Sequence, residues 1–193
     1  MELVLCLIIY PSKQFPFVPF YYIVTYINRH ISRLRFLLQS DIINYQNINV
    51  LFFHNRQDIN YIINVYLDNN QTALHVLQNN IRNIRNTIVI TGNFNIRDYN
   101  WNPNYLHYST HIEVLNLVAD SLKLELFLFS NPGPTKYTDN PRDTNSVLDL
   151  VFLPSDNSGF GKYIFFLDKR KPSNHISIAI EVGMKNKDID VVI

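Results

Sequence analysis

Two asparagines, Asn93 and Asn95, follow the apolar run NTIVI in the stretch TGNFNIRDYNWNP (Thr91 to Pro103). Asn is common in turns after strands, because its amide bonds nearby backbone groups. Asp149 lies inside the apolar run SVLDLVFL, where an acid is seldom left unpaired. His175 stands in SNH, directly before another apolar run. The amides, the carboxylate and the imidazole form either an active site, a disabled site or ordinary turns.

The elements that position these residues are mostly strands. Apolar residues at helical spacing predict two helices, at about Thr72 to Ile84 and His111 to Leu122. Many strands with few helices in a mixed order predict packed sheets with helices outside, and strand ends are natural places for a site. Runs rich in Val, Ile, Tyr and Phe predict strands at Tyr21 to Ile27, Ile48 to His54, Ile59 to Tyr66, Thr87 to Thr91, Leu124 to Phe129, Ser146 to Leu153, Tyr163 to Leu167 and Ile176 to Val182.

Length and charge limit the function classes. A chain of 193 residues with 47% hydrophobic residues buries a sizeable core and most simply forms one domain. With 17 Lys and Arg against 16 Asp and Glu, its net charge of +1 gives no global preference for nucleic acid, membrane or acidic substrates. Any site for a polyanion must therefore be local.

The start of the chain and its single cysteine indicate the setting. Cys6 alone permits no intrachain disulfide framework, which favours an intracellular setting, nuclear or cytoplasmic. The stretch MELVLCLIIY is shorter than the ~18 apolar residues of a membrane helix. It also lacks the basic region and cleavage site of a signal peptide. We expect a buried strand there, and no membrane partner.

Four motifs occur in a fixed order along the chain: INVY (Ile63 to Tyr66), TGNFNIRDYNW (Thr91 to Trp101), SVLDLVF (Ser146 to Phe152) and SNHISI (Ser173 to Ile178). With VTYINRHISRLRF (Val24 to Phe36) upstream, this set resembles the endonuclease/exonuclease/phosphatase superfamily, most closely the endonuclease domain of LINE-type (non-LTR) retrotransposons. The resemblance implies an α/β (α+β) fold, a four-layer sandwich of two packed mixed β-sheets flanked by helices. It further implies that the N-terminal strands are missing from a truncated copy.

The resemblance also divides the chain and implies its chemistry. Residues 1–20 form a non-matching apolar start, 21–183 the endonuclease/exonuclease/phosphatase-like domain and 184–193 a C-terminal tail. The implied activity is phosphodiester cleavage with Mg²⁺ or Mn²⁺, the implied partner is DNA, and no protein partner is evident.

The matched positions carry implied roles. Tyr66 matches a tyrosine that hydrogen-bonds the phosphate, and Asn95 an amide that contacts or orients it. Asp149 matches the Asp of S-V-x-D, and His175 a histidine on the phosphate. Further phosphate or DNA contacts are implied for Ser146 and expected for the basic residues Lys169 and Arg170.

Three departures from the family pattern put catalysis in doubt. Asn93 stands where the family has an Asp that acts as base or orients water, and Asn174 replaces the Asp that partners the histidine and helps bind metal. An amide takes no proton at neutral pH and is a weaker ligand for a hard cation. The family's metal-binding Glu has no counterpart, since Glu2 lacks its context. We expect impaired cleavage; a non-catalytic nucleic-acid-binding remnant and a phosphatase for small phosphate esters are alternatives.

Overall fold

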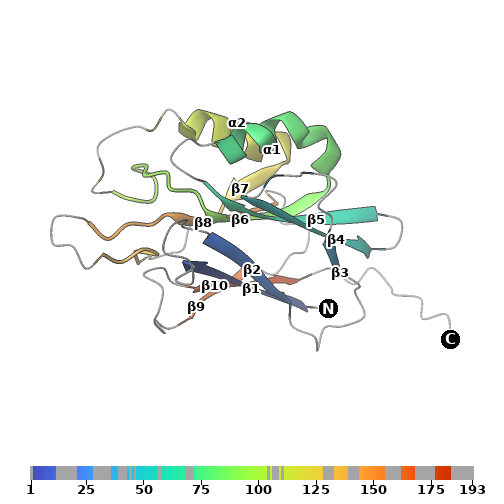
Figure 1. Ribbon diagram of the computed structural model, residues 1–193, viewed down its shortest axis with the longest axis horizontal. Coiled ribbons are helices and arrows are strands. Elements are labelled where there is room, and N and C mark those ends of the chain that lie inside the picture. Colours follow the sequence, from blue (N-terminus) through green and yellow to red (C-terminus); the bar gives the residue numbers. More distant parts are fainter. Residues whose placement is uncertain are drawn as a thin grey trace.

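The structure is a computed structural model, and its strands form two sheets stacked beneath a pair of helices (Figure 1). The residues that it describes are 2–11, 21–27, 36–38, 43, 45, 47–55, 58–67, 72–103, 105, 109, 111–127, 133–138, 144–154, 162–167 and 177–183.

The larger sheet has six strands and lies between the helices and the smaller sheet. Its order is β3 (Phe36–Leu38), β4 (Ile48–Asn55), β5 (Asp58–Tyr66), β6 (Thr87–Asn93), β8 (Asp149–Pro154) and β7 (Leu124–Leu126). Only β5 and β6 pair in parallel; the other neighbours are antiparallel, so this sheet is mixed.

The smaller sheet has four strands in the order β2 (Tyr21–Ile27), β1 (Glu2–Pro11), β10 (Ser177–Gly183) and β9 (Lys162–Leu167). Every pairing in it is antiparallel, so the expectation of two mixed sheets is correct for the larger sheet only. A parallel pair needs a connection of about a dozen or more residues, usually a helix, whereas nine residues (12–20) separate β1 from β2 and nine (168–176) separate β9 from β10. The stretch 1–20 thus contributes a strand between β2 and β10; the proposed domain boundaries themselves remain predictions.

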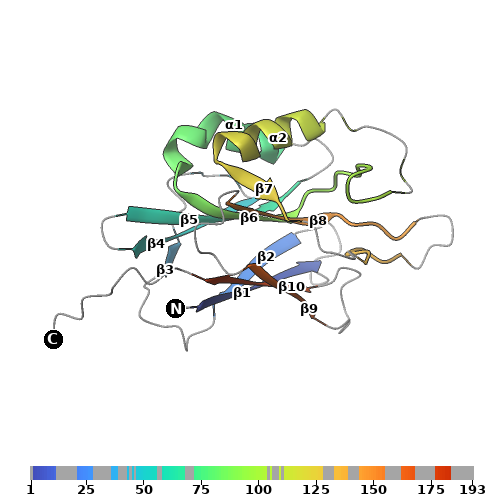
Figure 2. The same ribbon diagram turned by 180° about the vertical axis from the view of Figure 1, so that it is seen from behind.

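The helices lie on the face of the six-stranded sheet that points away from the smaller sheet, as both views show (Figure 2). Helix α1 (Thr72–Asn80) continues into the 3-10 turn η2 (Ile81–Ile84) and makes the crossover between the parallel strands β5 and β6. Helix α2 (His111–Ser121) follows β6 and leads to β7. The described helices supply one of the two helical layers that the four-layer expectation includes.

The main core lies between these helices and the six-stranded sheet. Each helix turns one apolar stripe inward, as the helical spacing in the sequence predicts. A fully buried Leu or Val contributes about 1.5–3 kcal/mol through its removal from water. The stripe residues and their partners on the sheet are Ala73, Leu74 and Leu77 of α1, Leu115 and Val118 of α2, and Ile63, Val65, Ile90, Leu150 and Phe152 of β5, β6 and β8.

The opposite face of the six-stranded sheet is more polar. Side chains alternate between the two faces of a strand, so Asn64 and Tyr66 of β5 project away from the helices when Ile63 and Val65 project toward them. By the same alternation Thr91 of β6 lies on this second face, where it is completely buried. The face therefore carries polar groups in its interior, a common feature near functional sites.

The predicted strands and helices are present, with some altered bounds. The run Ser146 to Leu153 predicts a strand, yet β8 begins at Asp149, because Ser146 instead makes an isolated bridge with Lys136. The strand predicted to reach Phe129 ends at Leu126, and its last two positions lie outside the described residues. In the described part of the chain, no helix is long and apolar enough to cross a membrane.

Candidate active site

Three of the predicted site residues meet where three neighbouring strands of the larger sheet come together. Asn93 ends β6 and pairs in register with Tyr66, the last residue of β5, and with Asp149, the first residue of β8. Residues in register on adjacent strands project to the same face, so the three side chains are neighbours. That face is turned away from the helices.

Burial differs across this trio. Asn93 and Asp149 are each only 2% exposed, whereas Tyr66 is half-buried and so keeps a side accessible from outside. Asp149 is the sole carboxylate of the three. The trio therefore offers one buried carboxyl group, one buried amide and one half-buried tyrosine at the same rim of the sheet.

The turn after β6 depends on a glycine and two asparagines. Gly92 has φ of 140°, and a Cβ there would lie 1.9 Å from the carbonyl oxygen of Val65. Asn95 has φ of 48°, a left-handed conformation that Asn tolerates better than most residues. The Asn95 N–H donates to Oδ1 of Asn93 at 2.9 Å, and Nδ2 of Asn95 donates to the carbonyl of Leu67 at 2.5 Å. Both asparagines thus shape the turn as well as standing at the site.

The entry into β8 is held by Thr135, a residue that the sequence patterns did not single out. Its Oγ1 accepts hydrogen bonds from the backbone N–H of Leu148 at 2.9 Å and of Asp149 at 3.0 Å. Thr135 is itself completely buried. It fixes the backbone that presents Asp149, and nothing in its sequence spacing could have revealed this, because the contact spans a loop.

Asn102 makes a second connection between the two loops. Its Oδ1 accepts from the N–H of Val147 at 2.8 Å, and its Nδ2 donates to the carbonyl of Val147 at 3.0 Å. The Asn102 side chain thereby bonds both the backbone N–H and the backbone carbonyl of Val147, as a neighbouring strand would. The turn that carries Asn102 is closed by Asp98, whose carbonyl accepts from the N–H of Trp101 at 3.2 Å and of Asn102 at 2.7 Å.

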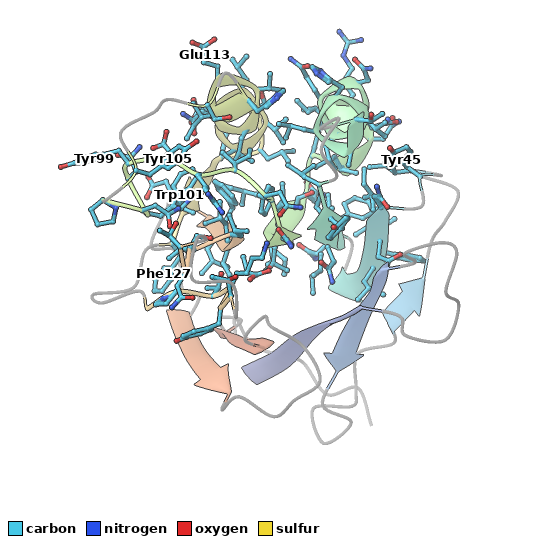
Figure 3. All side chains as sticks on the ribbon, turned by 60° about the vertical axis from the view of Figure 1, so that its left-hand side comes forward. Tyr45, Tyr99, Trp101, Tyr105, Glu113 and Phe127 are labelled. Atoms are coloured by element: carbon cyan, nitrogen blue, oxygen red, sulfur yellow. The ribbon has the colours of Figure 1, made fainter. Side chains whose placement is uncertain are left out.

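The two aromatic residues of this loop differ in placement (Figure 3). Trp101 points inward, is 3% exposed and donates its indole N–H to the carbonyl of Ile96 at 3.1 Å. Tyr99 points outward and is 59% exposed. Trp101 is therefore a structural anchor of the loop.

The remaining predicted site residues cannot be placed, with one exception. Asn174, His175, Lys169 and Arg170 lie outside the described residues. Ser146 is described: it is buried, and its backbone pairs with Lys136 through N–H to carbonyl bonds of 2.9 and 3.1 Å.

The described strand ends supply one carboxyl group, that of Asp149, toward a Mg²⁺ site. Magnesium prefers a near-octahedral set of hard oxygen ligands and is usually held through carboxylates. Across the described residues, no three His, Cys, Asp or Glu side chains gather closely enough to hold a metal ion. At the strand ends Asp149 supplies one carboxylate, while the carbonyl oxygen of Asn93 is already a hydrogen-bond acceptor.

Comparison with known proteins places this fold. Residues 60–179 match the family described as endonuclease-reverse transcriptase. No curated protein sequence matches the chain. Among solved structures, the endonuclease domain of TRAS1, a telomere-specific non-LTR retrotransposon, superposes with a TM-score of 0.61 over 93% of this chain and 81% of that one, at 15% identity. TDP2 of D. rerio, complexed with a single-strand DNA product, superposes with a TM-score of 0.53 over 92% of this chain and 77% of that one, also at 15% identity.

These likenesses in structure show the shared fold, that of endonucleases, exonucleases and phosphatases, and confirm the fold expected from the sequence motifs. The family match covers well over half of the chain and includes Tyr66, Asn93 and Asp149. The chain belongs to the endonuclease-reverse transcriptase family.

Proposed function

We propose that this chain is a DNA-binding endonuclease domain of retrotransposon type whose phosphodiester cleavage is impaired. The observation that carries the proposal is the position of Asn93, in register between Tyr66 and Asp149 at the rim of the sheet. The family pattern has a carboxylate there. In this proposal, an amide stands where the family pattern has the group that would accept a proton.

The side chains at the rim suit binding of a phosphodiester better than its cleavage. The Tyr66 hydroxyl can donate to a phosphate oxygen, since tyrosine is protonated at neutral pH. Asn95 has already committed one amide N–H to Leu67, and Asn93 its oxygen to Asn95. Attack by water needs a group that removes a proton, and neither amide does so. Asp149, which matches the Asp of S-V-x-D in the resemblance, has a carboxyl group that can accept a hydrogen bond from a neighbouring water.

Binding is proposed to be local and sensitive to salt. The net charge of +1 gives the chain no strong overall attraction to DNA. DNA contacts are therefore proposed to come from few side chains near the rim. For duplex DNA, each phosphate that a cationic side chain neutralises changes the slope of the logarithm of the binding constant against the logarithm of the salt concentration by about −0.9.

The test is a binding titration with a fluorescent duplex of about two helical turns at several salt concentrations, with the DNA recovered afterwards and its strands sized. We expect salt-dependent binding with intact strands. Tyr66→Phe removes only the hydroxyl, and we expect it to weaken binding by up to about tenfold, the range of one hydrogen bond. The matched control is Tyr99→Phe, because Tyr99 points outward from the loop.

Two outcomes would overturn the proposal. Efficient cleavage of the duplex by the unaltered chain would contradict impairment. Hydrolysis of p-nitrophenyl phosphate without any affinity for the duplex would instead assign the chain as a small-ester phosphatase, a function that the same fold also supports.

A further inference from the structure

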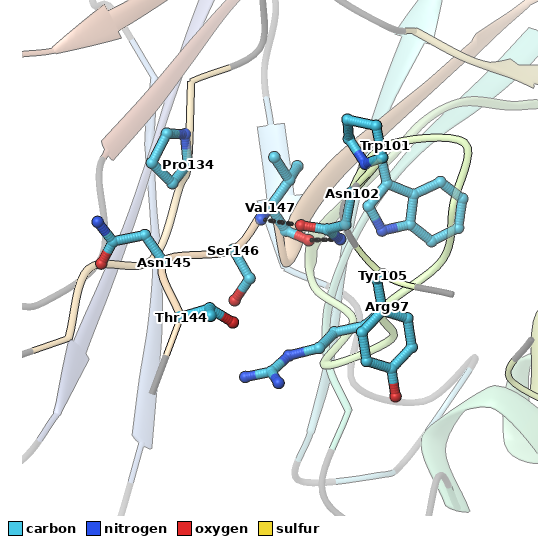
Figure 4. Close-up of a pocket in the computed structure, with 10 residues that line it drawn as sticks. Arg97, Trp101, Asn102, Tyr105, Pro134, Thr144, Asn145, Ser146 and Val147 are labelled. Atoms are coloured by element: carbon cyan, nitrogen blue, oxygen red, sulfur yellow. Dashed lines mark hydrogen bonds between the residues drawn. The ribbon is translucent and has the colours of Figure 1, made fainter. Parts of the chain in front are cut away.

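A pocket of about 370 Å³ opens beside the candidate active site, between the loop after β6 and the segment before β8 (Figure 4). Arg97 lies in its wall two residues after Asn95, and Val147 two residues before Asp149. Two residues span at most roughly 7 Å, so the pocket adjoins the start of β8, whereas Arg97 lies four residues after Asn93, the end of β6. We call it the Arg97 pocket.

The lining of the Arg97 pocket favours an anion. Its ten residues include one arginine and no aspartate or glutamate. Among the residues that the structure describes, no hydrogen bond or ion pair holds the Arg97 guanidinium. Guanidinium groups recognise phosphate through planar, paired N–H donors. A phosphate group is thus the natural ligand for this end of the pocket.

Among the other polar residues in the wall, Asn102 is already committed, Ser146 is buried and Thr144 is exposed. Both amide atoms of Asn102 bond Val147, as the dashed lines in Figure 4 show. Ser146 is 3% exposed, and its hydroxyl has no hydrogen-bond partner among the described residues. In the close-up, the hydroxyls of Ser146 and Thr144 point to the side of the pocket toward which Arg97 extends. An incoming oxygen that reached the buried hydroxyl would offset the cost of leaving it unmatched.

The rest of the wall includes apolar rings. Tyr105, Pro103 and Pro134 contribute them, and Tyr105 lines the same pocket as Arg97 (Figure 4). Aromatic faces stack on nucleobases without regard to sequence. A volume near the lower end of the roughly 300–1,000 Å³ typical of small-ligand sites suits one nucleotide but not a base pair.

We propose that the Arg97 pocket is a subsite for one unpaired nucleotide next to the scissile position, with its phosphate on Arg97 and its base or sugar against Tyr105. This inference rests on the proposed function, because it takes the bound strand to be DNA. It adds a ligand contact at Arg97, a position to which the sequence analysis gives no role.

The test compares Arg97→Gln with Arg85→Gln in binding a fluorescein-labelled short oligo-dT strand by anisotropy at several salt concentrations. Arg85 is exposed in the turn before β6, so its replacement removes the same charge at the opposite end of a seven-residue strand. We expect Arg97→Gln to weaken binding by roughly five- to twentyfold and to lower the salt slope by about 0.7, the value for one phosphate on a single strand. Arg85→Gln should change neither.

A second arm separates a nucleotide from a bare phosphate. An abasic strand of equal phosphate number should bind more weakly than dT, and that difference should shrink in Tyr105→Leu. Equal binding by the two arginine variants overturns the inference, as does equal binding of the abasic and dT strands. Because cleavage is not measured, absence of nicking leaves the result intact, whereas failure to bind any DNA would also contradict the proposed function.

Discussion

At the scale of single residues, Asn93 closes the turn after β6 but has no group that accepts a proton at neutral pH. Its amide oxygen accepts the 2.9 Å hydrogen bond from Asn95 that closes the turn after β6. An aspartate would accept the same bond and would add a charge beside Asp149. The Asp-to-Asn exchange that the resemblance implies at this position would therefore preserve the turn and remove a group that can accept a proton.

The reverse substitution, Asn93→Asp, should lower stability in a way that metal reverses. Two carboxylates in register at buried positions repel each other, so we expect the free energy of unfolding to fall by on the order of 1–3 kcal/mol without divalent metal. Millimolar Mg²⁺ should restore much of this loss, because a cation between the carboxylates cancels the repulsion. Urea unfolding with and without Mg²⁺ measures both effects.

Asn116→Asp is the matched control, since it adds the same charge at an exposed position of α2. It should show little change in either buffer. A response of Asn93→Asp to Mg²⁺ no larger than that of the control would contradict the account of this position.

Gly92 supports a second prediction at this scale. Its φ of 140° and the 1.9 Å that would separate an added Cβ from the Val65 carbonyl oxygen leave no room for a side chain. We expect Gly92→Ala to lower the free energy of unfolding by roughly 3–5 kcal/mol. Gly133→Ala, where nothing lies within 4 Å of the added Cβ, should change the free energy of unfolding by less than about 0.5 kcal/mol. Thermal unfolding of both variants measures the difference. Similar values for the two variants would be inconsistent with the observed turn.

At the scale of elements, the site is made by the order of three strands. The sequence predicts a strand that ends at Tyr66, a strand that ends two residues before Asn93 and a strand that contains Asp149, and the motifs indicate that the three residues belong together. Their register follows from the parallel β5–β6 crossover and the antiparallel return of β8. Periodicity alone could not supply that register, because strands of similar composition pair in many orders.

Sequence patterns could not predict the shortest strand or the side-chain contacts between loops. Strand β3 has three residues, too few to show alternation. The Asn102 contact with Val147 joins residues 45 positions apart. Thr135 holds the start of β8 from 13 and 14 positions away. Such contacts depend on how loops meet in space, whereas apolar runs report local structure.

Thr135 gives a prediction at the element scale. Thr135→Val keeps the shape but leaves two buried N–H groups, of Leu148 and Asp149, without their acceptor. We expect the free energy of unfolding to fall by about 2 kcal/mol or more, with faster amide exchange at those two residues. Thr135→Ser retains the oxygen and should lose less than about 1 kcal/mol. Equal losses in the Val and Ser variants would show that the hydroxyl does not hold β8.

At the scale of the whole molecule, the main hydrophobic core and the candidate site lie on opposite sides of the six-stranded sheet. The helices and the main core lie on one side of the six-stranded sheet, and the candidate site lies on its other side at the rim (Figure 1). Loss of a carboxylate at the rim leaves the core packing untouched. Under the proposed function, the fold and the proposed DNA-binding surface would persist without cleavage, and the small net charge of +1 would confine DNA binding to local contacts.

The measurement that tests impaired cleavage most directly is nicking of supercoiled plasmid in Mg²⁺ by the unaltered chain and by the double variant Asn93→Asp, Asn174→Asp. We predict no nicking above buffer for the unaltered chain and clear nicking by the double variant. An Asp-to-Asn change beside a catalytic histidine costs about 10⁴-fold in serine proteases, which sets the scale of the expected recovery. Nicking by the unaltered chain at a similar rate, or inactivity of both proteins, would contradict the claim that the two amides impair cleavage.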